Sequence, residues 1–167
     1  MRHLIQGLAG LNEWVGRLMS LLLIFMVCLI GYDVAMRYLF QAGSVALQEL
    51  EWHLFSLIFL LGAAYTFKHD AHVRVDVLYQ SHFSKRTRQW INLGGHLLFL
   101  LPFCFLIIHS SLPFVYNAWQ FHEASPDPGG LPYRFLLKAT IPAGFTLLAL
   151  HALADSLKII LKLKNSG

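Results

Sequence analysis

The sequence predicts an all-α integral membrane protein in which four helices cross the bilayer, and two observations lead to this fold class. The chain has 167 residues, of which 56% are hydrophobic and 13% are charged, and its mean hydropathy is +0.55. A soluble domain normally carries about 25% charged residues, because polar surface must cover its core. The apolar residues also gather into four long runs. We therefore expect a single membrane domain over residues 1–167.

Each apolar run is long enough to cross a membrane as a helix. About 20 mostly apolar residues span the roughly 30 Å of hydrocarbon in a bilayer. An open sheet is excluded, since its edges would leave backbone groups without hydrogen bonds in lipid. The predicted transmembrane helices cover residues 18–40, 47–67, 90–116 and 135–161.

The segment before the first span, residues 1–17, has an amphipathic pattern. Leu4, Leu8, Leu11 and Val15 recur at three- and four-residue spacing, with polar and charged residues between them. This period predicts a helix that lies in the membrane interface and continues into the first span. A frayed polar tail is the alternative.

The basic residues predict the orientation of the helices. Of the 13 Lys and Arg residues, ten fall in the N-terminal segment, the loop between the second and third spans, and the C-terminal tail. Loops rich in Lys and Arg stay on the cytoplasmic side. We expect both termini in the cytoplasm, where these charges face anionic membrane lipids rather than nucleic acid. The ten residues are Arg2, Arg17, Lys68, Arg74, Lys85, Arg86, Arg88, Lys158, Lys162 and Lys164.

Two ionisable residues, Asp33 and Arg37, lie within the first predicted span. Placing such a group within the membrane costs roughly 2.5–3.5 kcal/mol on insertion scales, so its presence indicates a structural or functional role. Their spacing of four places them on one helix face, where they can pair. We interpret them as an electrostatic clasp, with Glu49 or Glu51 as further partners of Arg37 across the short hairpin. An ion or proton site is the alternative.

The start of the second span contains three further candidates. Glu49 and Glu51 are two residues apart and do not share a helix face, which argues against a paired-carboxylate acid–base site. Trp52 lies at the depth of an interfacial anchor. We therefore expect structural or partner-binding roles for this group.

The loop after the second span alternates polar and apolar residues. His72, Arg74 and Asp76 are separated by Val73 and Val75. A period of two predicts an extended segment packed on one side.

Catalysis and cofactor binding have little support in the sequence. No nucleophile elbow, P-loop, dinucleotide fingerprint or metal-binding helix motif is present, so we predict no catalytic residue, no metal site and no cofactor. Four-helix membrane cytochromes bind haem through two imidazoles, and His53, His96, His109 and His151 lie at suitable depths. His96 and His109 are thirteen residues apart and so lie on different helix faces. A haem-binding electron-transfer subunit stays a competing hypothesis.

A series of short motifs follows in a recognisable order along the chain. They are Arg37–Phe40, Gln48–Phe55, Gly62–Ala64, His72–Asp76, then Asp127–Pro132, Lys138 and Ile141–Phe145. In this order and spacing they resemble the small membrane (Q) subunit of tripartite ATP-independent periplasmic (TRAP) transporters, the DctQ-like family. That family often has a tryptophan just after the first outer loop, where this chain has Ala46 and Leu47.

The resemblance implies a non-catalytic transporter subunit in the bacterial inner membrane. In such systems a large membrane (M) subunit carries the sodium and substrate sites and moves as an elevator. A periplasmic substrate-binding (P) protein delivers the substrate, usually a small organic acid. The small subunit resembles a stationary scaffold that also helps to dock the binding protein. A self-sufficient small transporter, with Asp33 as its coupling carboxylate, is a further alternative.

The resemblance also implies roles for individual residues. Glu49, Glu51, Glu123 and Asp127 would face the periplasm and steer the binding protein. The segment His72–Asp76 would brace the cytoplasmic side against the large subunit.

Overall fold

The computed structural model describes residues 2–69 and 83–165, and helices dominate both parts. Four helical stretches are long and apolar enough to cross a membrane, which confirms the predicted fold class. The predicted extended segment at His72–Asp76 lies outside the described residues. In chain order, the elements are α1 (Arg2–Leu39), α2 (Val45–Lys68), α4 (Lys85–Gly95), the π-helical turn η1 (His96–Leu100), α5 (Leu101–Gln120) and α6 (Arg134–Asn165).

The first helix, α1, is a single element of 38 residues. At 1.5 Å per residue it is about 57 Å long, well beyond the roughly 30 Å of hydrocarbon in a bilayer. Residues 2–17 therefore continue into the first span without a break, and only part of α1 can lie in the hydrocarbon. The interfacial position of residues 1–17 stays a prediction.

The third spanning helix contains a π-helical turn just before Pro102. Proline has no N–H group, so Pro102 leaves the Leu98 carbonyl without its usual helical partner, and the proline ring would clash with that carbonyl. A wider turn relieves the clash, and the Leu101 N–H donates to the His96 carbonyl across it. Together α4, η1 and α5 form one continuous helical stretch, Lys85–Gln120, which extends beyond the predicted span at both ends.

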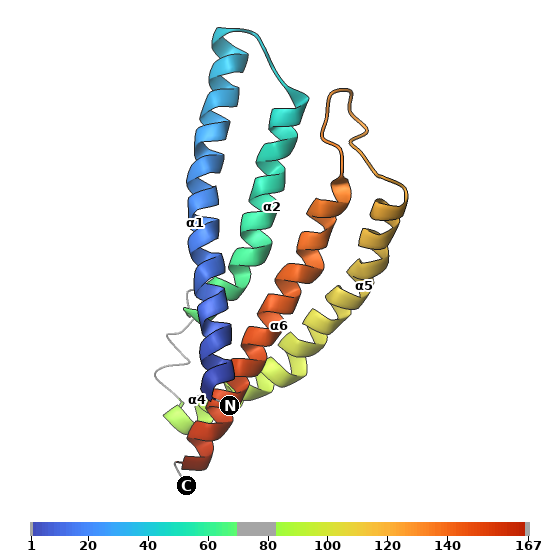
Figure 1. The fold of residues 1–167 in the computed structure, drawn as a ribbon. Helices are drawn as coiled ribbons and strands as arrows, with labels where there is room; N and C mark the ends of the chain where they lie inside the picture. The colour runs from blue at the N-terminus through green and yellow to red at the C-terminus, as the bar shows by residue number, and fades with distance from the viewer. Residues whose placement is uncertain (1, 70–82, 166–167) are drawn as a thin grey trace.

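The helices are arranged as a row rather than as a closed bundle. Helix α1 packs on α2, α2 packs on α6, and α6 packs on α5 (Figure 1). Helix α6 also contacts α1 and the α4–η1 segment, so it is the central element. Both termini lie at one end of the molecule, with α4 (Figure 1). We call this the terminal end, and the opposite end, with residues 40–44 and 121–133, the loop end.

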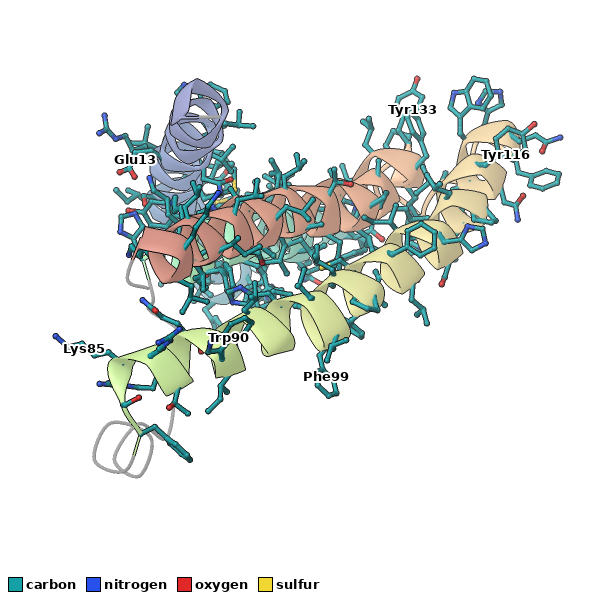
Figure 2. The ribbon with its side chains drawn as sticks, turned by 90° about the horizontal axis from the view of Figure 1, so that it is seen from below. Glu13, Lys85, Trp90, Phe99, Tyr116 and Tyr133 are labelled. Atoms are coloured by element: carbon teal, nitrogen blue, oxygen red, sulfur yellow. The ribbon has the colours of Figure 1, made fainter. Side chains whose placement is uncertain are left out.

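Small residues allow the helices to approach each other closely, as is usual in membrane proteins. A Cβ added at Gly144 on α6 would lie 2.6 Å from the Leu60 carbonyl oxygen on α2. Large apolar side chains such as Trp90 are mostly exposed, and Figure 2 shows Phe99, Tyr116 and Tyr133 directed away from the bundle. Among the described residues, the apolar ones that are almost completely buried are small: Ala64, Cys104, Ala118 and Ala152.

Candidate functional site

At the loop end, polar contacts converge on Glu49 in the second turn of α2. Its carboxylate is buried, with the residue 4% exposed. The Ser125 hydroxyl donates to Oε1, the Leu131 N–H donates to Oε2 at 2.6 Å, and the Arg134 guanidinium lies 3.6 Å from Oε1. One carboxylate thus joins α2 to the 121–133 loop and to the start of α6. We call Glu49, Ser125, Leu131 and Arg134 the loop clasp.

The two arms of the 121–133 loop are also bonded to each other. The Ser125 N–H donates to the Leu131 carbonyl at 3.0 Å, and the Arg134 N–H donates to the Glu123 carbonyl at 3.0 Å. The Ser125 hydroxyl additionally accepts a hydrogen bond from the Asp127 N–H at 3.1 Å. These bonds shape the loop so that Ser125 and Leu131 both reach Glu49.

Two neighbouring glycines permit this loop conformation for different reasons. Gly129 has a φ of +81°, a conformation that residues with a Cβ rarely adopt. Gly130 is required by space, because a Cβ there would lie 2.8 Å from Oε2 of Glu49 and closer still to the Ser125 side chain. The two glycines are therefore needed for the loop to pack on Glu49.

Two cations at the start of α6 each pair with a carboxylate and contact an aromatic ring. The Arg134 guanidinium, which pairs with Glu49, lies 5.7 Å from the centre of the Trp52 ring. The Lys138 ammonium donates to the Glu123 carboxylate and lies 3.8 Å from the centre of the Phe114 ring. Cation–π contacts of this kind hold charged side chains against apolar walls.

The predicted pair in the first span is present as a local contact. The Arg37 guanidinium donates to Oδ2 of Asp33, which is 1% exposed. Among the described residues, Oδ1 of Asp33 and Oε1 of Glu51 are buried without a hydrogen-bond partner. Arg37 was also expected to reach Glu49, but the cation beside that carboxylate is Arg134 from α6, and Arg37 pairs with Asp33.

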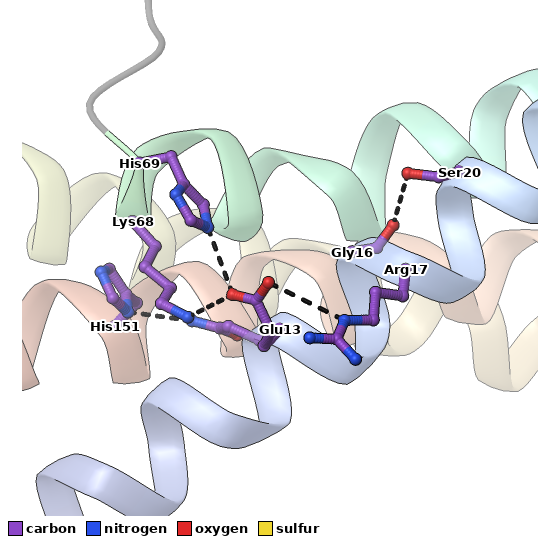
Figure 3. A network of polar contacts seen from close by, with 8 residues as sticks. Glu13, Gly16, Arg17, Ser20, Lys68, His69 and His151 are labelled. Carbon is purple, nitrogen blue, oxygen red and sulfur yellow. Dashed lines mark hydrogen bonds and ion pairs between the residues drawn. The ribbon is translucent and has the colours of Figure 1, made fainter.

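The terminal end has a second polar network, centred on Glu13 of α1. Its Oε2 accepts a hydrogen bond from the Lys68 ammonium at 2.6 Å and lies 3.3 Å from Nε2 of His69. Arg17 lies 3.9 Å from Oε1 (Figure 3). This network joins α1 to the end of α2 and is about one-third exposed.

Beside this network a buried hydrogen bond joins α1 to α6. Asn12 and His151 are 3% and 4% exposed, and Nδ2 of Asn12 lies 2.9 Å from Nδ1 of His151. Gly16, one turn further along α1, lies against the Tyr65 ring so closely that a Cβ there would overlap it. Close approach of α1 to α2 thus accompanies the polar contact to α6.

Comparison with known proteins agrees with this architecture. Residues 26–162 match the DctQ component of tripartite ATP-independent periplasmic transporters. The chain belongs to the DctQ family. It is also 31% identical over 115 residues to a predicted TRAP transporter small permease protein of Haemophilus influenzae, with 67% of this chain and 69% of the relative covered.

Family membership establishes the general role. The DctQ component is a membrane part of a TRAP transporter, so the chain is a multi-pass membrane protein and a transporter component. Membership implies a large membrane subunit and a periplasmic binding protein as partners.

In this DctQ component the acidic residues at the loop end differ in their surroundings. Glu49 is buried beneath the loop, so it holds the loop and is not available to attract a partner directly, which corrects that part of the prediction. Glu123 is partly exposed and paired with Lys138, and Asp127 is exposed at the turn. Glu51 lies on another face of α2. Of the predicted steering residues, Asp127 is exposed, and Glu51 and Glu123 are partly exposed.

The histidines at the terminal end are already engaged by other side chains. The rings of His96 and His151 both contact the edge or face of Phe67, with centroid distances of 5.2 and 5.7 Å. His151 also shares Nδ1 with Asn12. A haem between these two imidazoles would have to displace Phe67, so this geometry favours the transporter role over the electron-transfer alternative.

Several residues of these networks had no signal in the sequence. Asn12 and His151 are 139 residues apart, and Glu49 and Ser125 are 76 residues apart. Neither pair forms a motif with regular spacing. A polar residue within an apolar helix suggests that a hydrogen-bond partner exists on another helix, but it does not indicate which residue that partner is.

Proposed function

We propose that this DctQ component is the stationary scaffold subunit of a sodium-coupled, binding-protein-dependent transporter for small organic acids. It would lie in the bacterial inner membrane with both termini in the cytoplasm and the loop end in the periplasm. The distribution of Lys and Arg supports this orientation, since ten of thirteen fall on the terminal side or in the loop between α2 and α4.

The row arrangement of the spanning helices carries the scaffold proposal. Within the most apolar stretches, 11% of the residues are buried in the first span and in the third span, which contains α5, and 6% in the second, against 33% in α6. The outer helices α1 and α5 therefore leave apolar surface on both sides of a thin layer. Lipid can cover such surface, and so can a large membrane subunit.

The polar residues also support a scaffold rather than a transport pathway. Two buried hydroxyls within the spans, those of Ser111 and Thr140, donate to carbonyls of their own helices. The buried carboxylates Asp33 and Glu49 lie near the loop end and each has a basic partner. This arrangement gives the self-sufficient transporter no favoured ion path.

The loop clasp supports a docking role for the loop end. A loop tied to α2 and α6 through a single carboxylate presents a fixed surface, and a preorganised surface loses little entropy when a partner binds. Glu123 and Asp127 would attract basic residues of the binding protein. The loop between α2 and α4, including His72–Asp76, would brace the other side against the large subunit.

Reconstitution into liposomes tests the scaffold role. We expect the chain alone, under an inward sodium gradient, to show no uptake of a labelled organic acid in the presence of the binding protein. Liposomes that contain both the chain and the large subunit should take up the acid, and liposomes that contain the large subunit without the chain should not. Sodium-dependent uptake by the chain alone would refute the scaffold proposal.

A charge reversal tests the docking role. Asp127→Lys should weaken binding of the periplasmic protein to the reconstituted complex and raise the half-saturating concentration of that protein in uptake. Lys85→Glu at the terminal end is the matched control, since it reverses one exposed charge at the other end of the molecule. Equal uptake curves for Asp127→Lys and wild type would contradict steering by this residue.

A further inference from the structure

A groove of about 240 Å³ lies between α2, α5 and α6 near the loop end. Its walls are two stripes of residues at helical spacing. Helix α2 contributes Trp52, Ser56 and Leu60, which lie one turn apart. Helix α6 contributes a matching stripe that begins at Arg134, and Phe114 of α5 closes one side. The groove therefore runs parallel to the helix axes and so along the membrane normal.

The polarity of the groove changes along its length. Its outer end, at the loop end, contains Arg134 and the amphipathic ring of Trp52, and Lys138 lies about one helical turn deeper than Arg134. About two helical turns deeper, or about 12 Å at 1.5 Å per residue, the walls are the aliphatic side chains of Leu60 and Ile141. Such a gradient matches a molecule with an anionic head and an apolar tail.

Both cations keep hydrogen-bond donors available for a ligand. The carboxylates that pair with them, Glu49 and Glu123, do not line the groove in the part of the chain that the structure describes. A guanidinium has five N–H donors and an ammonium has three. A phosphate can therefore bind without displacing either carboxylate.

We propose that this groove binds a glycerophospholipid, with its phosphate at Arg134 and Lys138 and one acyl chain along Leu60 and Ile141. Charge complementarity selects this occupant, because a transmembrane helix of another protein would bring an apolar surface to two cations. The positive end of the α6 helix dipole, at Arg134, adds to the attraction. The site does not depend on the proposed scaffold role or on which side of the membrane the loop end faces.

Native mass spectrometry of the full chain in detergent tests this site, with 1-palmitoyl-2-oleoyl-phosphatidylglycerol as the probe. We expect one phosphatidylglycerol to bind with higher affinity than any further copies. Diacylglycerol with the same chains lacks the phosphate and should bind at least about tenfold more weakly, the loss expected for charge-assisted hydrogen bonds. Glycerol 3-phosphate lacks the chains and should not compete.

Two matched serine variants locate the lipid. Ser56 and Ser110 are both partly exposed, and each hydroxyl donates to the carbonyl four residues before it. Ser56→Phe fills the groove and leaves both ion pairs unchanged, so it should weaken phosphatidylglycerol binding at least about tenfold. Ser110→Phe adds the same ring outside the groove and should change binding by less than about twofold.

A cation variant tests the phosphate contact. Lys138→Gln should also weaken binding, whereas Lys85→Gln at the terminal end should not. Because Lys138→Gln also removes the partner of Glu123, Ser56→Phe is the stricter test.

Four results would overturn the proposal. They are equal binding by the Ser56→Phe and Ser110→Phe variants, equal affinity for diacylglycerol, full competition by glycerol 3-phosphate, and a dimer of the chain that dissociates in Ser56→Phe. The last result would assign the groove to a second copy of the chain.

Discussion

The two ends of the helix row are held together by different kinds of polar contact. At the loop end, the buried carboxylate of Glu49 has three partners, from the loop and from α6. At the terminal end, the contacts are divided between the partly exposed ion network of Glu13 and the buried hydrogen bond of Asn12 and His151. Loss of the Glu49 carboxylate would therefore remove the contacts of α2 with both the loop and α6. At the terminal end, loss of either the Glu13 network or the Asn12–His151 hydrogen bond would leave the other in place.

The difference follows from what each end must join. The loop end connects helices to a 13-residue loop over positions 121–133, whose backbone amides need acceptors. One carboxylate supplies two oxygens to several donors at once. The terminal end joins helices directly, so small residues such as Gly16 bring them together and polar side chains add to that packing.

The largest effect is expected for Glu49→Ala. Removing this carboxylate leaves the Leu131 N–H without its acceptor and Arg134 without its counter-ion, and such losses are costly when buried. The melting temperature in detergent, from tryptophan fluorescence, should fall on the order of 10 °C. Protease cleavage in the 121–133 loop should increase.

Glu51→Ala is the matched control for that variant. It removes the same side chain two positions away on α2, where one oxygen lacks a partner among the described residues. The melting temperature should be unchanged or slightly higher. A fall as large as that of Glu49→Ala would show that loss of any carboxylate at this end, rather than loss of the loop clasp, causes the effect.

Gly130→Ala should have the next largest effect. The added Cβ would overlap the Ser125 side chain and approach Oε2 of Glu49, so the loop must move away from α2. Overpacking of this kind costs about 1–3 kcal/mol. Gly43→Ala, where no atom lies within 4 Å of the added Cβ, is the control in denaturation measurements. If both variants unfold alike, the close approach at Gly130 is unimportant.

Asn12→Leu should destabilise the terminal end less. His151 then loses its buried partner, which costs about 1 kcal/mol, since hydrogen bonds between membrane helices are modest. Asn117→Leu on the exposed face of α5 is the matched control. Hydrogen exchange near Asn12 should increase in the first variant and the loop end should be unaffected. Exchange that rises equally at both ends would show that the ends are coupled.

The smallest effect is expected for Glu13→Gln. The network is partly exposed, so its ion pairs are screened by water and salt. The melting temperature should change by no more than about 2 °C at low salt, and the difference should vanish at about 1 M salt, where the Debye length is about 3 Å. A larger effect that persists at high salt would show that the Glu13 ion pairs are shielded from solvent, as those of Glu49 are.

Local features of the structure were predictable from the sequence. Four helices follow from four apolar runs, because backbone groups in lipid must bond within their own segment. The Asp33–Arg37 contact follows from a spacing of four on one helix. The π turn before Pro102 also has a local cause in a missing N–H group. The continuation of the N-terminal helix into the first span was also predicted, and α1 is one helix from Arg2 to Leu39.

The sequence by itself therefore determined the class of the protein, the number of spanning helices and the contacts within each helix, because these depend on neighbours along the chain. The tertiary structure alone decided that Arg134 rather than Arg37 pairs with Glu49, that Asn12 meets His151, and that α6 is the central helix. Those outcomes depend on how close two helices can approach and at what relative height. Small residues far apart in the sequence, such as Gly16 and Gly144, control that approach without any recurring pattern.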